Sequence, residues 1–301
     1  DSGYKFMVTC TESYGSLLNF FREGGIDIFS GEKAYQDASN SVAIKSLFVR
    51  FSPDEQFLIQ SGKRLFKGMD DYNDVHRFQF DLETEGLDAN NDAIFQIGIR
   101  DNRGYEVVLE TLGDTPKEKR DSERYNIKKF FSIISELVPD IITAYNSENF
   151  DWPFFQKRCD RLGLDITKIA KTLKPKAKIR WKDAIIKLGG EQEYYKQTYM
   201  WGYNILDISH SVRRAQAINS DIKSWGLKYI TEYSGVAKQN RVYVPGNIIN
   251  KTWLDKSDHA FNDGNGDWYK ITENKPLKEG YGIKRGDYIV QRYLLDDLWE
   301  T

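Results

Sequence analysis

The chain has 301 residues, and its 43 Lys and Arg nearly balance its 45 Asp and Glu, giving a formal net charge of −2. Hydrophobic residues make up 40% of the chain and aromatic residues 14%, so an intrinsically disordered chain is excluded and a substantial core is expected. The near-neutral charge excludes a histone-like protein held to nucleic acid by its overall charge. It does not exclude an enzyme that confines positive charge to one surface.

The sequence shows no targeting signal. No apolar run approaches the roughly 18 residues of a membrane span, so no membrane partner is expected. The first ten residues, DSGYKFMVTC, have no basic lead, apolar stretch or cleavage site of a signal peptide. Cys10 and Cys159 lie far apart and form no metal-binding pair, which fits a reducing compartment. We therefore expect a cytoplasmic protein.

Two domains are expected, with the boundary in the polar stretch 67–76. Residues 1–76 are predicted to form a small α+β accessory region, and residues 77–301 form the main domain. The predicted elements of the accessory region are a helix at 16–21 and strands at 46–51 and 56–60.

The main domain begins with an antiparallel meander of strands at 78–82, 93–99 and 105–109, with a tight turn at 101–104. A helix is predicted at 124–137, because apolar residues recur there every three or four positions. A strand at 141–145 and a helix at 152–162 follow, so the fold class is α/β, a mixed sheet layered with helices. The later predicted elements are a hairpin of 181–187 with 193–199, a strand at 203–208, helices at 212–218, 227–233 and 286–299, and a surface loop at 257–268.

Asp81 and Glu83 stand out in the first strand of this domain, within FQFDLETEGLD. Residues two apart in a strand point to the same face, so the two carboxylates share one face, while Phe80 and Leu82 share the other. Paired carboxylates repel each other unless a hard cation such as Mg²⁺ neutralises them. The alternative is an acidic strand end that leads into a turn.

Asp151 is the second acidic candidate, in the stretch NSENFDWPFF. Pro153 suits the first turn of a helix, so Asp151 is placed at a helix N-terminus on the carboxyl side of a sheet strand. Active sites in such sheets usually lie there. The alternative is that Asp151 only caps the helix.

Tyr293 and Asp297 form the third candidate, because residues four apart on a helix share one face. Tyr203 and Asp207 have the same spacing. They lie in a predicted strand, where that spacing spans about 13 Å, so we favour Tyr293 with Asp297. Asp296 would point about 100° away from this face.

In this order, the three motifs Asp81-Leu-Glu83, Asn149-Phe-Asp151 and Tyr293 to Asp297 resemble the three exonuclease motifs of family B DNA polymerases. The resemblance covers residues 78–301 and implies a ribonuclease H-like exonuclease fold. It also implies a 3′-to-5′ exonuclease that proofreads DNA by two-metal hydrolysis, with two Mg²⁺ or Mn²⁺ as cofactors. The residues that would hold the metals are Asp81, Glu83, Asp151 and Asp297, and Tyr293 would align the attacking water.

The expected substrate is a DNA 3′ end, single-stranded or mispaired. Bases could stack on aromatic side chains beside the acids, although burial of these side chains is the alternative. The basic run 166–182 has seven Lys and Arg and no acid, and could hold a phosphate backbone, although such runs are usually solvated faces. The predicted DNA-binding residues are Leu87, Tyr145, Asn146, Asn149, Phe150, Lys174, Lys176, Lys178 and Arg180. The hairpin is similar to a family element that helps to separate a mispaired primer end.

Nothing in the sequence resembles the catalytic motifs of a polymerase palm, so we expect the exonuclease part of a longer polymerase, whose other domains are its partners. A viral source is one expectation, and the host cytoplasm would then be the compartment. The alternatives are a free-standing nuclease that acts on DNA or RNA, and a non-catalytic module that binds DNA or a protein partner with the same fold.

Overall fold

The computed structural model describes residues 29–30, 47–48, 53–62, 68–238, 241, 243–255, 259–262, 268–272 and 288–301. The chain divides into two compact units, Asp1–Asp70 and Asp71–Thr301. The helix predicted at 16–21 lies outside the described residues. None of the helices in the described ranges is long and apolar enough to cross a membrane.

In the first unit, β1 (Phe29–Ser30) pairs in parallel with β2 (Leu47–Phe48), and α3 spans Pro53–Ser61. The strand predicted at 56–60 is therefore wrong, because these residues are helical. A proline suits the first helical turn, and Glu55 complements the positive end of the helix dipole. These start signals outweigh the short apolar run that suggested a strand.

The second unit is built on a five-stranded sheet in the order β5-β4-β3-β6-β9. The strand β3 pairs antiparallel with β4, which pairs antiparallel with β5, whereas β6 is parallel to both β3 and β9. This mixed sheet flanked by helices confirms the ribonuclease H-like fold class. The strands are β3 (Arg77–Thr84), β4 (Ile94–Asp101), β5 (Glu106–Glu110), β6 (Ile141–Ala144) and β9 (Asn204–Asp207).

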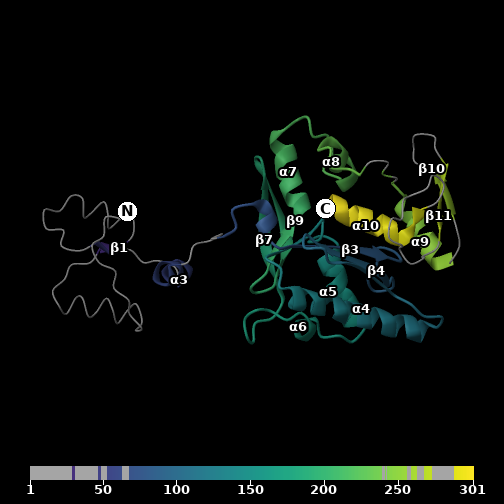
Figure 1. The fold of residues 1–301 in the computed structure, drawn as a ribbon, viewed down its shortest axis with the longest axis horizontal. Helices are drawn as coiled ribbons and strands as arrows, with labels where there is room; N and C mark the ends of the chain where they lie inside the picture. The colour runs from purple at the N-terminus through teal and green to yellow at the C-terminus, as the bar shows by residue number, and fades with distance from the viewer. Residues whose placement is uncertain are drawn as a thin grey trace. The chain divides into compact units, whose positions relative to one another are not determined.

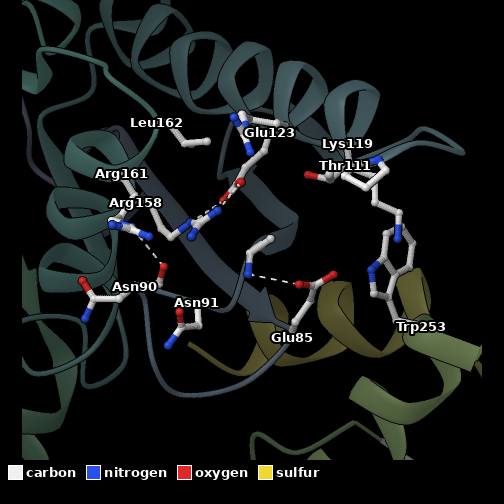
Figure 2. Close-up of a pocket in the computed structure, with 13 residues that line it drawn as sticks. Glu85, Asn90, Asn91, Thr111, Lys119, Glu123, Arg158, Arg161, Leu162 and Trp253 are labelled. Atoms are coloured by element: carbon white, nitrogen blue, oxygen red, sulfur yellow. Dashed lines mark hydrogen bonds and ion pairs between the residues drawn. The ribbon is translucent and has the colours of Figure 1, made fainter.

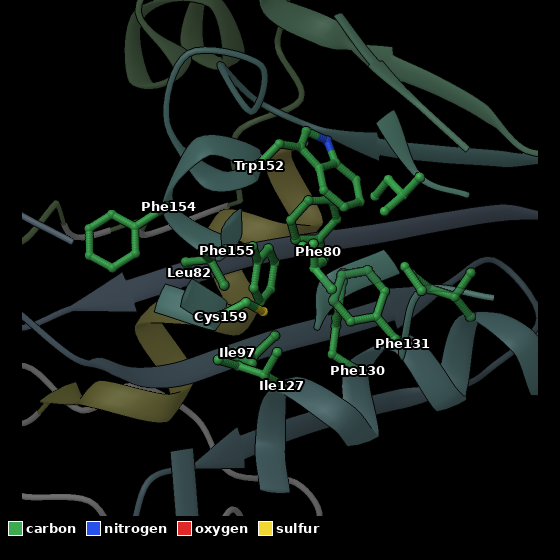
Figure 3. Packing of buried hydrophobic residues seen from close by; sticks show 14 of the residues in the cluster. Phe80, Leu82, Ile97, Ile127, Phe130, Phe131, Trp152, Phe154, Phe155 and Cys159 are labelled. Carbon is green, nitrogen blue, oxygen red and sulfur yellow. The ribbon is translucent and has the colours of Figure 1, made fainter. Parts of the chain in front are cut away.

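Alternate residues of β3 face the hydrophobic core on one side of the sheet and the candidate acids' side on the other. Phe80 packs against α4 and α5, with ring centroids 5.1 Å from Phe130 and 5.0 Å from Trp152. Figure 3 shows this aromatic cluster, in which Phe80, Phe130, Trp152 and Phe155 are at most 1% exposed. Asp81 and Glu83 are only partly buried and point to the opposite face. The burial of the aromatic side chains therefore fixes which face of the sheet receives the acids.

The helix α4 (Pro116–Leu137) begins earlier than the predicted helix at 124–137. Its start is a capping box, in which Thr115 accepts a hydrogen bond from the Glu118 amide and Glu118 accepts one from the Thr115 amide. Residues 116–123 are polar and show no apolar periodicity, so the capping box is what marks the beginning of the helix. The helix α5 (Asp151–Arg161) agrees with its prediction.

The strands β7 (Arg180–Leu188) and β8 (Glu191–Tyr199) form the predicted hairpin as a separate two-stranded sheet. Near it lies α7 (Ile208–Ile218), which starts directly after β9. The remaining helices of this region are the 3₁₀ helix η1 (Tyr72–Asp74), α6 (Ile166–Ile169) and α8 (Leu227–Tyr233).

The C-terminal part holds α9 (Gly246–Asp255), the strands β10 (His259–Asn262), β11 (Trp268–Thr272) and β12 (Tyr288–Ile289), and α10 (Val290–Glu300). The three strands form a second small sheet. The surface loop predicted at 257–268 is therefore wrong for 259–262 and for Trp268, which are strand residues. As Figure 1 shows, α10 (yellow) runs beside β3 and β4.

Candidate functional site

Asp81 and Asp151 approach each other because β3 and β6 are parallel neighbours. Gln79 pairs with Thr143, so Asp81 is level with Tyr145, immediately beyond the end of β6. The loop that follows β6 leads to Asp151, the first residue of α5. The two acidic motifs therefore meet at one edge of the sheet.

Asp151 does not cap α5, so the capping interpretation is wrong. The N-cap residue is Phe150, and it makes no side-chain capping bond. The Asp151 side chain is buried, at 2% exposure, and its Oδ1 atom has no hydrogen-bond partner. A buried carboxylate oxygen without a partner is costly. This atom is thus available to a ligand that could offset the cost.

The third motif reaches the acids because α10 packs closely on β4. Gly98 pairs with Asp81 across the two strands, so both face α10. A Cβ atom on Gly98 would lie 2.7 Å from Leu298 Cδ1 and 2.8 Å from Leu294 Cγ. The missing side chain of Gly98 therefore lets the helix approach, and Asp297 on this helix approaches Asp81.

Replacing Gly98 by alanine is expected to push α10 away from the sheet. The protein should lose about 1–3 kcal/mol of stability, as overpacked cores do, and should hold a divalent metal more weakly. Urea unfolding and a Mn²⁺ titration measure the two effects. Gly190→Ala is the control, because a Cβ atom there meets nothing within 4 Å. Equal behaviour of the two variants would contradict the close-approach argument.

The four carboxylates of this site all have raised pKa values. Loss of solvation within the protein raises the pKa of Asp81 well above its usual range, although the side chain is not fully buried. The charges of Asp151, Asp297 and Glu83 add to this shift. Burial, and then the charge of Asp297, raise the pKa of Glu83 to about 8. Burial raises the pKa of Asp151 to about 7 and that of Asp297 to about 6. Uncompensated negative charge is therefore concentrated here.

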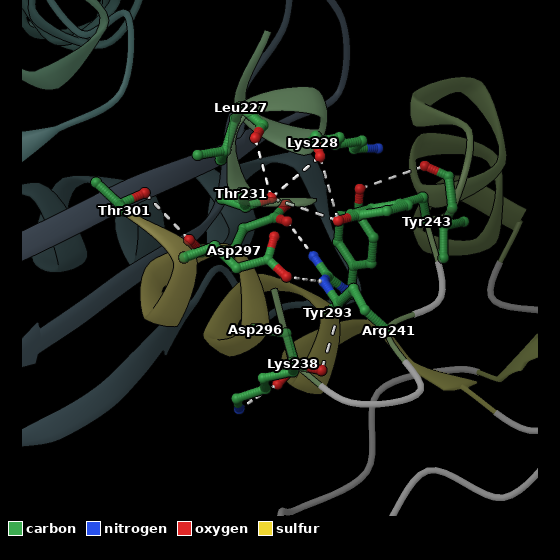
Figure 4. A network of polar contacts seen from close by, with 12 residues as sticks. Leu227, Lys228, Thr231, Lys238, Arg241, Tyr243, Tyr293, Asp296, Asp297 and Thr301 are labelled. Atoms are coloured by element: carbon green, nitrogen blue, oxygen red, sulfur yellow. Dashed lines mark hydrogen bonds and ion pairs between the residues drawn. The ribbon is translucent and has the colours of Figure 1, made fainter. Parts of the chain in front are cut away.

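Two cations that the sequence analysis missed, Arg241 and Lys228, belong to the network of polar contacts around Asp297 (Figure 4). Arg241 donates hydrogen bonds to Asp297 and to Glu300, the latter at 2.9 Å, and its side chain is 3% exposed. The charges of Lys228 and Arg241 lower the pKa of both Glu83 and Asp297, against the effect of burial. No local sequence pattern marks the two residues, because α8 and the segment before α9 bring them to α10 only in the folded chain.

Stability without metal should fall with rising pH. The unfolded chain releases these protons near pH 3.8 to 4.5, whereas native Glu83, Asp151 and Asp297 hold theirs to about pH 6 to 8. The native state thus binds more protons in this window, so its free energy of unfolding decreases as pH rises. Melting temperatures measured across the window, with EDTA and with Mg²⁺, test this: Mg²⁺ should flatten the slope, and Asp81→Asn should reduce it. An unchanged slope in Asp81→Asn would contradict the assignment.

The donor set fits a hard divalent cation. The four acids offer only oxygen atoms, which suit Mg²⁺ or Mn²⁺, and Oδ1 of Asp151 is buried without a hydrogen-bond partner. Within the described ranges, no three acidic, histidine or cysteine side chains already form a metal-binding group. Asp297 Oδ1 is bonded to Arg241. A metal ion that used this oxygen would compete with Arg241.

Of the predicted DNA-binding residues next to the acids, four are engaged within the protein. The Tyr145 hydroxyl donates a hydrogen bond to the Trp225 carbonyl, and the Phe150 ring packs 5.3 Å from that of Phe154. The Asn149 side chain donates to that of Asn146 at 3.0 Å. Leu87, by contrast, is 85% exposed. Their contact with DNA stays a prediction.

The predicted basic residues Lys174, Lys176, Lys178 and Arg180 are all exposed. Two of them, together with Lys182, lie over aromatic rings. The Lys174 Nζ atom is 4.4 Å from the ring centre of Trp201, and Lys182 Nζ is 3.8 Å from that of Tyr199. The guanidinium carbon of Arg180 lies 4.9 Å from the Tyr199 ring. This cation-aromatic surface, made of Lys174, Arg180, Lys182, Tyr199 and Trp201, lies at the base of the hairpin.

The alternative pair, Tyr203 and Asp207, does not form a catalytic motif. Asp207 is the N-cap of α7 and accepts a hydrogen bond from the Ser209 amide. It also accepts bonds from the amides of Asn146 and Glu148, at 2.9 and 3.0 Å. Asp207 therefore holds the loop before Asp151.

A pocket of about 560 Å³ lies between α4, the end of α5 and the loop that follows β3 (Figure 2). None of the four candidate metal ligands lines it. At its wall, Arg158 Nε donates to Glu123 Oε1 at 2.7 Å, and Arg158 Nη1 donates to the Ala89 carbonyl at 3.2 Å. Glu123 also accepts a bond from the Ile94 amide. This buried ion pair fastens the middle of the loop between β3 and β4, at Ala89, and the start of β4, at Ile94.

Comparison with known proteins finds similar sequences among polymerases. The DNA polymerase of Pyrococcus glycovorans is 33% identical over 116 residues, which are 37% of this chain and 15% of that polymerase. The DNA polymerase of Pyrococcus horikoshii is 36% identical over 90 residues, 29% of this chain and 7% of that protein. The chain thus spans at most 15% of the length of these relatives.

A solved family B DNA polymerase, from Pyrobaculum calidifontis, aligns with 75% of this chain and 23% of its own, at 21% identity and a TM-score of 0.46. The family model described as the exonuclease domain of DNA polymerase family B matches residues 60–230, more than half of the chain. The matched segment includes Asp81, Glu83 and Asp151. The chain therefore belongs to the exonuclease-domain family of the family B DNA polymerases.

Proposed function

We propose that the chain is a divalent-metal-dependent 3′-to-5′ DNA exonuclease that hydrolyses the terminal phosphodiester and proofreads for a family B DNA polymerase. The observation that carries this proposal is the meeting of four carboxylates from β3, α5 and α10, whose pKa values are all raised. Such concentrated charge is typical of a functional site. The similarity to polymerases supports a DNA substrate and other polymerase domains as partners.

Two Mg²⁺ or Mn²⁺ ions are the proposed cofactors. Asp81 would contact both ions, Glu83 and Asp297 would complete the site of one, and Asp151 would hold the other, largely through water. The ions would supply an activated water and neutralise charge on the phosphate that is cleaved.

The protein's own groups would orient the reactants. Arg241 and Lys228 place positive charge beside Glu83 and Asp297, where the charge of a phosphodiester would also lie. Tyr293 is 3% exposed, and the guanidinium carbon of Arg241 lies 4.8 Å from its ring. Its hydroxyl donates a hydrogen bond to the Val244 carbonyl at 3.4 Å. In this proposal Tyr293 would align the attacking water.

Tyr293→Phe should slow cleavage by about 10²-fold, the contribution of a positioned proton donor or acceptor. The phenylalanine ring fills the same space, so folding and the Kd for Mn²⁺ should stay near those of the wild type. Single-turnover rates on a DNA oligonucleotide and a calorimetric Mn²⁺ titration measure these effects. An unchanged rate would make Tyr293 a packing residue of α10.

The base of the hairpin is the proposed contact for DNA beyond the terminal nucleotide. Its cation-aromatic surface offers charges for phosphates and rings for bases, the combination that single-strand binders use. Leu87, which is exposed just after β3, is a candidate to contact the terminal bases.

The direct test is a time course with 5′-labelled DNA, single-stranded or with a mispaired 3′ end, in Mg²⁺, Mn²⁺ or EDTA. A metal-dependent ladder that shortens from the 3′ end is expected. Parallel reactions on 3′-labelled DNA should release only mononucleotides, and an RNA oligonucleotide of the same sequence tests the sugar preference. Absence of metal-dependent cleavage, or cleavage from the 5′ end, would overturn the proposal.

A further inference from the structure

Glu148, between β6 and α5, is a buried acid that the proposed chemistry does not use. It is 4% exposed, and its carboxylate accepts two hydrogen bonds from Thr198. The Thr198 amide donates to Oε2 at 2.8 Å, and the Thr198 hydroxyl donates to the same oxygen at 2.7 Å. Thr198 lies in β8, so this contact joins the loop between β6 and α5 to the hairpin.

The same loop is held from the opposite end by a second buried carboxylate. Asp207 accepts bonds from the amides of Asn146 and Glu148, and it is fixed in turn by the amide and hydroxyl of Ser209. Asn146 adopts a left-handed conformation with φ of 59°. The loop therefore owes its shape to partners on β8 and at the start of α7.

This loop shape determines where Asp151 lies. The Phe150 amide donates to the Asn146 carbonyl at 3.1 Å, and the Trp152 amide donates to the Ser147 carbonyl at 3.0 Å. These bonds span Asp151 and connect the first turn of α5 to the loop. A shift of the loop would therefore move the backbone of Asp151.

The hairpin end of this connection continues to the cation-aromatic surface. Thr198 pairs with Trp181 in the ladder and directly precedes Tyr199, over which Arg180 and Lys182 lie. A strand of DNA on this surface would press on the residues that flank Thr198. Among these contacts, the bond from Thr198 to Glu148 gives the shortest path from the cation-aromatic surface to Asp151.

We propose that Glu148 is a positioning residue that couples the β7–β8 hairpin to Asp151, so that the hairpin determines how well the site holds its metal. This inference rests on the proposed function. Supporting partners of metal ligands typically change metal affinity or activity by about 10- to 100-fold when they are removed.

Three variants test the coupling: Glu148→Gln, Thr198→Val and the double variant. Glutamine keeps the size of Glu148 and can still accept from the Thr198 amide, and valine keeps the shape of Thr198. Glu191→Gln is the matched control, because it removes a carboxylate from the exposed end of the same hairpin. The readouts are the Kd for Mn²⁺ by calorimetry without DNA, the single-turnover rate on single-stranded DNA, and the melting temperature.

Each single variant is expected to weaken Mn²⁺ binding by about 10-fold, and the double variant should be no weaker than the worse single variant, because both changes weaken the same connection. The control should match the wild type. A Mn²⁺ affinity within twofold of the wild type in both single variants, or fully additive losses, would overturn the inference. Lower melting temperatures with unchanged Mn²⁺ affinity would also overturn it, since Glu148 would then only stabilise the fold. Wild-type protein that neither binds Mn²⁺ nor cleaves would instead refute the proposed function.

Discussion

Asp81→Ala is expected to reduce cleavage by at least about 10³-fold, because each 1.4 kcal/mol of lost transition-state stabilisation costs tenfold and metal ligands contribute several kcal/mol. The fold should remain intact. Removing one carboxylate from a group of four that repel one another should even raise the melting temperature of the metal-free protein. The measurements are the 3′-end time course and thermal unfolding in EDTA.

The control for this prediction is Glu106→Ala, an acid on β5 whose closest ion-pair contact is a long 3.9 Å to Arg100. It should leave the rate and the melting temperature near the wild-type values, because exposed ion pairs contribute little. Full activity of Asp81→Ala would exclude Asp81 as a metal ligand. Unfolding of Asp81→Ala would show that the carboxylate is structural.

Arg158→Met should cost about 3–5 kcal/mol of stability, because it leaves the Glu123 carboxylate buried without its partner. The loop between β3 and β4 would lose its anchor at the Ala89 carbonyl as well. Since this loop follows directly after Glu83, we also expect weaker metal binding. Urea unfolding with a fixed slope measures the change in free energy.

A surface ion pair in the same helix provides the comparison. Lys129 lies 3.5 Å from Glu136 on the exposed side of α4, so Lys129→Met should change stability by less than about 1 kcal/mol. Adding Glu123→Gln to Arg158→Met should recover much of the loss, because glutamine removes the buried charge and can still accept from the Ile94 amide. If the double variant were less stable than Arg158→Met, the unpaired charge would not be the cause.

Much of the main domain could be predicted from local patterns. The alternation in FQFDLET predicted a strand with the acids on one face, and β3 has this arrangement. The pair Gly189 and Gly190 predicted the hairpin of β7 and β8. Such elements are set by neighbours a few residues apart, which is why they can be predicted from the sequence alone.

The predictions of secondary structure failed where apolar periodicity is weak or where a capping residue decides where a helix begins. The strand expected at 56–60 is the helix α3, and α4 begins at Pro116 because Thr115 and Glu118 cap it. In the segment predicted as a loop at 257–268, β10 exists because it pairs with β11.

The sequence by itself determined the family, the fold class, and the order and spacing of the candidate acids, because these depend on local residue patterns. Only the tertiary structure decided which charges meet. Gly98 lets α10 approach β3. Arg241 and Lys228 reach the acids from segments without any motif. Glu148 contacts Thr198, fifty residues away in the sequence. Burial and electrostatic interaction depend on distance in space, which the sequence pattern does not encode.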